Sequence, residues 1–230
     1  SDFATVAAAN QTRRIELPAT SLTATAVQLA AGQVVGKGNR VSVLTAGSTT
    51  CVVKLGYSNS PTQWSWKLIS DVEINGNAKA SNGIEFGDAS ADPQIAGRWE
   101  GYRLVVKNCA KGIYKPYGNI GNNWYALQLS SNDYGYYAQD ASGIGKTMHP
   151  GNDLFIGGEF SYNALAAYYV NGLVGGAGGT KFVNTIFEQN PGFGVYVKNW
   201  ETSYTPLVFD GAWFENNATS ASVTIDGVVH

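Results

Sequence analysis

A pair of phenylalanines followed by an asparagine returns at a fixed interval in the C-terminal part of the chain. The motif is Phe, four residues, Phe, two residues, Asn, and it recurs with a period of 27 residues. The three copies are Phe155/Phe160/Asn163, Phe182/Phe187/Asn190 and Phe209/Phe214/Asn217. A fixed period of this size indicates stacked structural repeats, in which each repeat contacts only its neighbours.

Looser copies of the motif precede the three regular ones. An apolar residue followed three residues later by an asparagine occurs as Ile74/Asn77, Val105/Asn108 and Leu129/Asn132. The interval from copy to copy varies between 24 and 31 residues. A constant motif with a variable interval indicates loop insertions on a fixed scaffold, here of six units.

The apolar segments of each unit have the length and composition of β-strands. Runs such as AAYYV (166–170) and FGVYV (193–197) are short, alternating, and rich in β-branched and aromatic residues. Gly, Asn, Asp and Ser separate them, and no convincing amphipathic helix occurs. We therefore predict an all-β parallel β-helix with at least six coils from about residue 65 onward. The phenylalanines should form internal stacks, and the asparagines a ladder at one turn, where Asn tolerates left-handed geometry.

The first part of the chain is less regular. We expect residues 1–64 to form an N-terminal cap and the first irregular coil or coils, and residues 65–230 the regular coils of one continuous domain. Two alternatives stay open for its C-terminal end: the chain is a fragment of a longer one, or a partner covers that end. The segment GKGN (36–39) lacks the order of a phosphate-binding loop and is interpreted as a turn between strands. Residues 22–31 are expected to be a helical or strand cap.

Composition limits the classes of partner. Charged residues make up 14% of the chain and its net charge is −2, without a basic run, which argues against nucleic acid and anionic membranes. No apolar run of membrane-spanning length occurs, so no membrane insertion is expected. Cys51 and Cys109 are interpreted as buried free thiols, and no metal or cofactor is predicted.

Two glutamates are candidates for catalysis. Strand alternation should turn Glu188 and Glu215 outward, one coil apart on the same face. Stacked carboxylates repel each other, but a glycoside hydrolase uses such a pair as acid and as base or nucleophile. Glu159, in the coil before, is a third candidate. The alternative is that these side chains simply point into solvent.

The strand after each asparagine supplies a second outward row. Its middle positions are Glu85, Tyr114, Tyr137, Tyr169, Tyr196 and Thr224. Four tyrosines in successive coils would form a stripe about 15 Å long, and rings with a polar edge suit sugars. A subunit interface would use the same stripe equally well. Trp124 and Trp213 are further candidates for the walls of a groove, with core or interface as the alternative.

Several segments resemble a known family. IELPAT (15–20), VVGKGNRVSVL (34–44) and ISDVEINGNAKASNGIEF (69–86) precede coils with the pattern N-x-x-x-G-I-Y. Over about residues 12–227 the chain resembles right-handed parallel β-helices of the pectate-lyase type, and is similar to bacteriophage tailspike proteins. The resemblance implies a virion homotrimer, or otherwise an extracellular protein, that binds a host bacterial polysaccharide, O-antigen or capsule, and hydrolyses its glycosidic bonds without a cofactor.

Two other classes remain open. A non-catalytic carbohydrate-binding or structural β-helix module would need only the aromatic stripe. A polysaccharide lyase would use a base such as Arg98, Arg103 or Lys107, but no acidic cluster for calcium accompanies these residues.

Overall fold

A computed structural model describes residues 14–24, 27–29, 33–47, 50–55, 67–78, 81–86, 99–116, 121–139, 153–171, 179–200, 207–218 and 223–227. Within these ranges the chain consists of strands and turns. They contain no helix, and hence no helix able to cross a membrane.

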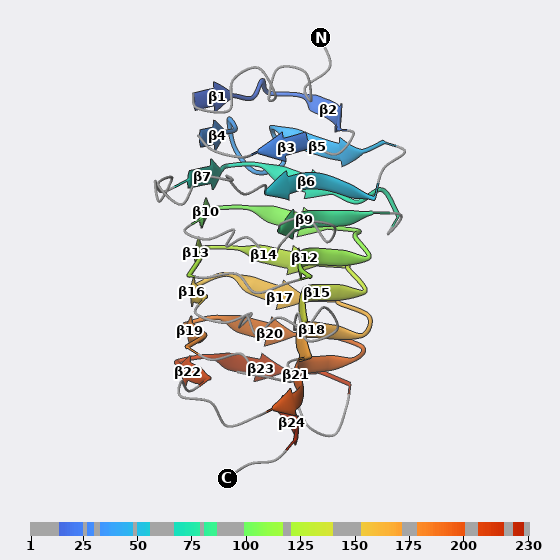
Figure 1. The fold of residues 1–230 in the computed structure, drawn as a ribbon, viewed down its shortest axis with the longest axis vertical. Coiled ribbons are helices and arrows are strands. Elements are labelled where there is room, and N and C mark those ends of the chain that lie inside the picture. Colours follow the sequence, from blue (N-terminus) through green and yellow to red (C-terminus); the bar gives the residue numbers. More distant parts are fainter. Residues whose placement is uncertain are drawn as a thin grey trace, which may run out of the picture.

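The strands enter three parallel sheets in strict rotation, so that three consecutive strands make one coil. In the described part of the chain each sheet has eight strands, and each strand pairs with the equivalent strand of the neighbouring coil or coils. The fold is therefore a right-handed parallel β-helix, as predicted. The coils are stacked as a column with β1 near one end and β24 near the other (Figure 1).

Each sheet runs the length of the column. Sheet A consists of β1 (Arg14–Glu16), β4 (Gln33–Val35), β7 (Lys67–Ser70), β10 (Trp99–Tyr102), β13 (Asn123–Tyr125), β16 (Leu154–Ile156), β19 (Lys181–Val183) and β22 (Val208–Asp210). Sheet B consists of β2 (Ser21–Ala24), β5 (Val43–Ala46), β8 (Glu73–Asn75), β11 (Val105–Lys107), β14 (Gln128–Ser130), β17 (Glu159–Ser161), β20 (Ile186–Glu188) and β23 (Trp213–Glu215). Sheet C consists of β3 (Val27–Leu29), β6 (Cys51–Leu55), β9 (Asn82–Phe86), β12 (Lys111–Lys115), β15 (Tyr134–Gln139), β18 (Ala166–Asn171), β21 (Phe193–Trp200) and β24 (Val223–Gly227).

The N-terminal strands β1 to β6 belong to the same three sheets as the later strands. The segment 36–39 lies between β4 and β5, which confirms its interpretation as a turn between strands. Within the segment 22–31, residues 22–24 belong to β2 and residues 27–29 form β3, so these described residues are strands and not a helix. The division of the chain at residue 64 stays a prediction.

Two rows of phenylalanines stack inside the last coils, as predicted. The row on sheet A consists of Phe155, Phe182 and Phe209, and the row on sheet B of Phe160, Phe187 and Phe214. Neighbouring rings on sheet A lie 4.8 and 5.3 Å apart and are nearly parallel. On sheet B one pair meets edge-on at 5.2 Å and the next stacks at 4.8 Å. The rings of the last coil are only partly buried.

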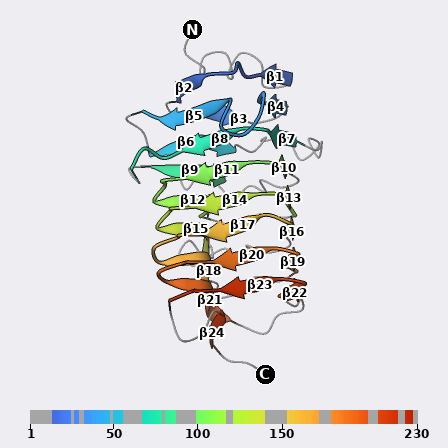
Figure 2. The same ribbon diagram turned by 180° about the vertical axis from the view of Figure 1, so that it is seen from behind.

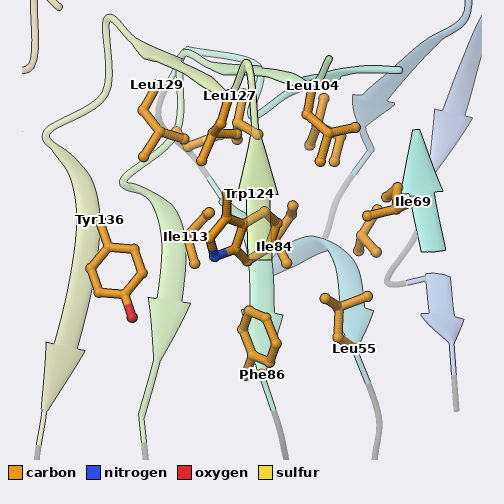
Figure 3. Packing of buried hydrophobic residues seen from close by; sticks show 14 of the residues in the cluster. Leu55, Ile69, Ile84, Phe86, Leu104, Ile113, Trp124, Leu127, Leu129 and Tyr136 are labelled. Carbon is orange, nitrogen blue, oxygen red and sulfur yellow. The ribbon is translucent and has the colours of Figure 1, made fainter. Parts of the chain in front are cut away.

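Aliphatic side chains and a few large rings fill the middle coils. Trp124 is fully buried and meets Phe86 edge-on, with ring centroids 6.1 Å apart. Figure 3 shows Trp124 among Ile84, Ile113 and Phe86. Gly101 is the register partner of Trp124 in the preceding coil, where a Cβ atom would collide with the indole ring. The small residue in one coil therefore makes room for the large one in the next.

The asparagine ladder lies at the turn between sheets B and C. The Oδ1 atom of Asn163 accepts hydrogen bonds from the backbone N–H and from Nδ2 of Asn132, at 3.2 and 3.1 Å. Nδ2 of Asn163 donates to the carbonyl oxygen of Leu129 at 2.9 Å and to Oδ1 of Asn190 at 3.0 Å. Asn190 is bonded to Asn217 in the same way. Each amide thus satisfies backbone groups of the preceding coil that burial would otherwise leave unpaired.

The expectations about this turn are confirmed only in part. Val106, not Val105, shares the register of Ile74 and Leu129, so that Cys109 rather than Asn108 occupies the ladder position in that coil. The backbone N–H of Cys109 donates to Oδ1 of Asn132 at 2.9 Å.

Asn77 is left-handed as expected, with φ of 52°, but Asn132, Asn163, Asn190 and Asn217 are not. The left-handed residue is the one before the ladder position, with φ between 50° and 58° in four coils: Ser131, Tyr162, Gln189 and Asn216. The left-handed residue turns the chain, and the asparagine that follows it bridges the coils.

A second buried polar group joins sheets C and A. Lys115 Nζ lies 3.0 Å from Asp153 Oδ1, and both side chains are fully buried. Tyr136 donates its hydroxyl to Asp153 Oδ2 at 2.7 Å, and Asn122 donates Nδ2 to Oδ1 at 2.9 Å. The carboxylate therefore has a counter-charge and hydrogen-bond donors on both oxygens, which is the condition for holding a charge inside a protein.

The phenylalanine stack can be tested by truncating one ring at a time. Phe182→Ala should lower the free energy of unfolding by about 3–5 kcal/mol, because the cavity lies between rings on both sides. Phe209→Ala should cost less, because that ring is only partly buried in the last coil. Denaturant titration followed by circular dichroism measures both. Equal losses, or a negligible loss for Phe182→Ala, would contradict the internal stack.

Candidate functional site

Four tyrosines lie in direct register on the outer face of sheet C. We call Tyr114, Tyr137, Tyr169 and Tyr196 the tyrosine column; they come from β12, β15, β18 and β21, whose stacking Figure 2 shows. Glu85 is the register partner before the column and Thr224 the one after it. The order of residues is the one expected from the sequence.

The rings of the tyrosine column pack on one another. Tyr137 and Tyr169 stack with ring centroids 4.8 Å apart and planes 25° from parallel. Tyr114 and Tyr196 each meet the end of this pair at a steep angle, at 5.7 and 5.5 Å. Tyr134 adds a fifth ring, 4.9 Å from Tyr137. The two central rings therefore each cover part of the other's face.

Burial raises the pKa values of phenols in this cluster. It raises the pKa of Tyr169 to about 12, with a smaller contribution from the neighbouring tyrosines. It also raises the pKa values of Tyr134 and Tyr137. These groups therefore stay protonated at neutral pH and can donate hydrogen bonds. Tyr114 Oη in turn accepts a hydrogen bond from Gln139 Nε2 at 3.2 Å.

Charged groups gather at the N-terminal end of the column. Lys111 Nζ lies 3.7 Å from the ring centroid of Tyr114 and 4.6 Å from that of Tyr137. Lys54 Nζ lies 4.0 Å from Glu85 Oε1. Sequence reasoning missed Lys111 and Tyr134, although both stand three residues before a column tyrosine and are register partners.

Glu188 and Glu215 lie on the outer face of sheet B as direct register partners, as expected from their spacing. Glu188 is half-buried and Glu215 is exposed. Glu215 accepts hydrogen bonds from Trp213 Nε1 at 3.0 Å and Asn216 Nδ2 at 3.4 Å. The structure therefore places two carboxyl groups one coil apart on one face.

Glu159 is not stacked on this pair. Its register partner is Ile186, whereas Ser161 is the partner of Glu188. Glu159 and Ser161 are two residues apart on β17, and the Ser161 hydroxyl donates to the Glu159 carboxyl group. Because residues two apart along a strand share a face, Glu159 lies in the neighbouring row of that face.

The two candidate tryptophans have different environments. Trp124 is fully buried, so it belongs to the core, which was the alternative left open for it. Trp213 is 60% exposed and lies in register with Ile186, which is 37% exposed. Trp213 is therefore beside the carboxyl pair on sheet B and not beside the tyrosine column.

The bases considered for a lyase are engaged elsewhere. Arg103 forms two hydrogen bonds to Asp71, at 2.6 and 2.8 Å, and Lys107 Nζ lies 2.9 Å from Glu73 Oε1. Arg98 lies outside the described residues. Within the described part of the chain, no three His, Cys, Asp or Glu side chains gather as ligands of a metal would.

Known proteins match the chain in fold alone. No family model and no curated protein matches it. ORF18 of Geobacillus virus E2 has a similar structure, with a TM-score of 0.66 and 14% identity, covering 86% of this chain and 42% of that one. The A-module of mannuronan C-5 epimerase AlgE6 from Azotobacter vinelandii has a TM-score of 0.51 and 14% identity, covering 95% and 72% of the two chains. The chain thus spans less than half the length of the virus protein.

Proposed function

We propose that the chain binds a polysaccharide along the tyrosine column, as the β-helix part of a virion protein that recognises a bacterial O-antigen or capsule. The observation that carries the proposal is the register of four outward tyrosines on successive strands of sheet C. One protein of similar fold comes from a virus and another is named for its action on mannuronan, which supports the proposal only by analogy.

The physical properties of the column suit a linear, hydroxyl-rich ligand. Its phenol groups repeat at the strand spacing of about 4.8 Å, so they present hydrogen-bonding groups in a straight row. The rings are held by contacts with one another, so little side-chain freedom is lost on binding. A sugar chain lying parallel to the axis of the β-helix would meet several of these groups at once.

Substitutions in the column test binding. Tyr169→Ala and Tyr196→Ala should each weaken binding about tenfold or more, because each removes a ring and a hydroxyl from the row. An array of purified bacterial O-antigens and capsular polysaccharides identifies the ligand, and calorimetry measures affinity. Tyr102→Ala is the control, because Tyr102 stacks on Tyr125 at 4.4 Å on sheet A, away from the column. Equal affinities for all variants would exclude the column as the binding surface.

In addition to binding, we propose that Glu188 and Glu215 hydrolyse the bound polysaccharide, so that the protein is an endo-acting glycoside hydrolase. Their Cα atoms are about one strand spacing apart, near the separation of about 5–5.5 Å between carboxyl groups of retaining enzymes. Side chains that splay apart would reach the about 6.5–9.5 Å of inverting enzymes. We propose Glu188 as the acid, Glu215 as the base or nucleophile, and Glu159 as a third candidate on the same face. Trp213, next to Glu215, is a candidate for contact with the sugar if it is not covered by the subunit interface proposed below.

The carboxyl pair is tested by replacing its charge and keeping its shape. Glu188→Gln and Glu215→Gln should lower turnover by about 10²–10⁴-fold without loss of folding, because each removes a proton-transfer group. Release of reducing ends from the bound polysaccharide measures turnover, and Glu100→Gln on sheet A is the matched control. Unchanged turnover in both variants would leave the pair as a solvated surface feature. A wild-type chain that binds but releases no reducing ends would instead be a non-catalytic binding module.

We also propose that the protein is a homotrimer. Ile186 and Trp213 are adjacent in register and exposed, and apolar groups exposed together often mark a protein interface. Light scattering of the complete protein at micromolar concentration should therefore give three times the mass of one subunit, and Trp213→Ser should shift the equilibrium towards monomer. A wild-type protein that is only monomeric would contradict this proposal.

A further inference from the structure

We propose that the ligand of the tyrosine column is an acidic saccharide, whose repeating unit carries a carboxylate that Lys111 binds. The inference rests on the proposed binding function and adds the chemical class of the ligand. It is carried by the position of one ammonium group among the tyrosine rings.

Lys111 projects from β12 into the aromatic cluster. Its Nζ atom lies 3.7 Å from the ring centroid of Tyr114 and 4.6 Å from that of Tyr137, and it forms no ion pair with any described residue. Other lysines of the neighbouring strands do form such pairs, as Lys54 does with Glu85 at 4.0 Å and Lys107 with Glu73 at 2.9 Å. Lys111 thus has aromatic partners where these lysines have carboxylates.

This environment leaves binding capacity in the ammonium group. The side chain is half-buried. Burial lowers the pKa of Lys111, and the negative charge of Glu85 partly opposes this shift. A cation–π contact is generally weaker than a charge-assisted hydrogen bond to a carboxylate. An ammonium group has three N–H donors. An aromatic ring face offers them no oxygen acceptor, whereas a carboxylate does. A carboxylate from a ligand would therefore complete the site.

Glu85 fixes where on the surface that carboxylate must lie. Glu85 continues the tyrosine column beyond Tyr114, where it accepts a hydrogen bond from Asn82 Nδ2 at 3.0 Å. An anionic group placed over Glu85 would be repelled. Lys111 and its register partner Tyr134 form the parallel row beside the column. The acidic group of the ligand therefore belongs beside the column at the level of β12, and its uncharged hydroxyls belong along the tyrosines towards β21.

The class of ligand can be tested on a saccharide array. Wild-type protein is applied to purified bacterial O-antigens and capsular polysaccharides, acidic and neutral, and each one bound is compared with its carboxyl-reduced derivative. We expect acidic polymers to be bound, reduction to weaken binding about tenfold or more, and added salt to weaken it as well. Lys111→Gln should reproduce the loss and reduce the salt dependence, whereas Lys111→Arg, which stays cationic and stacks on aromatic rings, should retain most affinity. Lys181→Gln, on sheet A beside Asp210, controls for the change in net charge.

The outcomes separate the two proposals. If the bound polymers are neutral, or if carboxyl reduction and Lys111→Gln leave affinity unchanged while Tyr169→Ala still weakens it, the acidic class is wrong and saccharide binding stands. If no saccharide binds, or if Tyr169→Ala and Lys111→Gln are both without effect on a bound one, the binding function of the column is overturned together with this inference.

Discussion

Pairing of each strand with the equivalent strand of the next coil is the constraint on which the rest of the structure depends. Parallel pairing in register makes each coil repeat the path of the last, so a side chain that is inward in one coil has inward neighbours above and below. The asparagine ladder extends this pairing through a turn, because each amide bonds both neighbouring coils. Asn163, for example, accepts from Asn132 and donates to Asn190. A slip of one residue would break these bonds and turn the phenylalanine rows outward.

This constraint explains which features could be predicted from the sequence. Where the period is constant, as from Phe155 onward, counting residues suffices to place rings inside and Glu188 beside Glu215. Counting was insufficient at the segment VVKNC, where Val105 and Val106 are both apolar and a thiol replaces the ladder amide. The sequence pattern therefore assigns the ladder position to Asn108, whereas in the structure Asn108 occupies the left-handed turn position before it.

Interactions that cross the coil interior left no pattern to count. Lys115 ends β12 and Asp153 immediately precedes β16, 38 residues apart. Strand alternation turns Lys115 inward with Ile113, but the charge of a lysine argues against burial unless its partner is known. Burial of this ion pair also depends on Tyr136 and Asn122, because they donate the further hydrogen bonds that the Asp153 carboxylate needs. The site of Lys111 could not be predicted for a related reason. Its ammonium group contacts the rings of Tyr114 and Tyr137, which come from two different coils.

The carboxyl pair and the tyrosine column lie on two different sheets of the β-helix, on either side of the turn that connects these sheets. The carboxyl pair ends strands of sheet B, the tyrosine column lies on sheet C, and the ladder turn joins them, as between Glu188 at the end of β20 and Phe193 at the start of β21. Ladder hydrogen bonds, such as those of Asn190, hold this turn fixed, so the two surfaces cannot close on a ligand by bending there. A ligand held along the column reaches the carboxyl groups only if it also passes around the turn. Joint use of both surfaces therefore requires a long, flexible polymer, whereas a short oligosaccharide bound to the column would remain uncleaved.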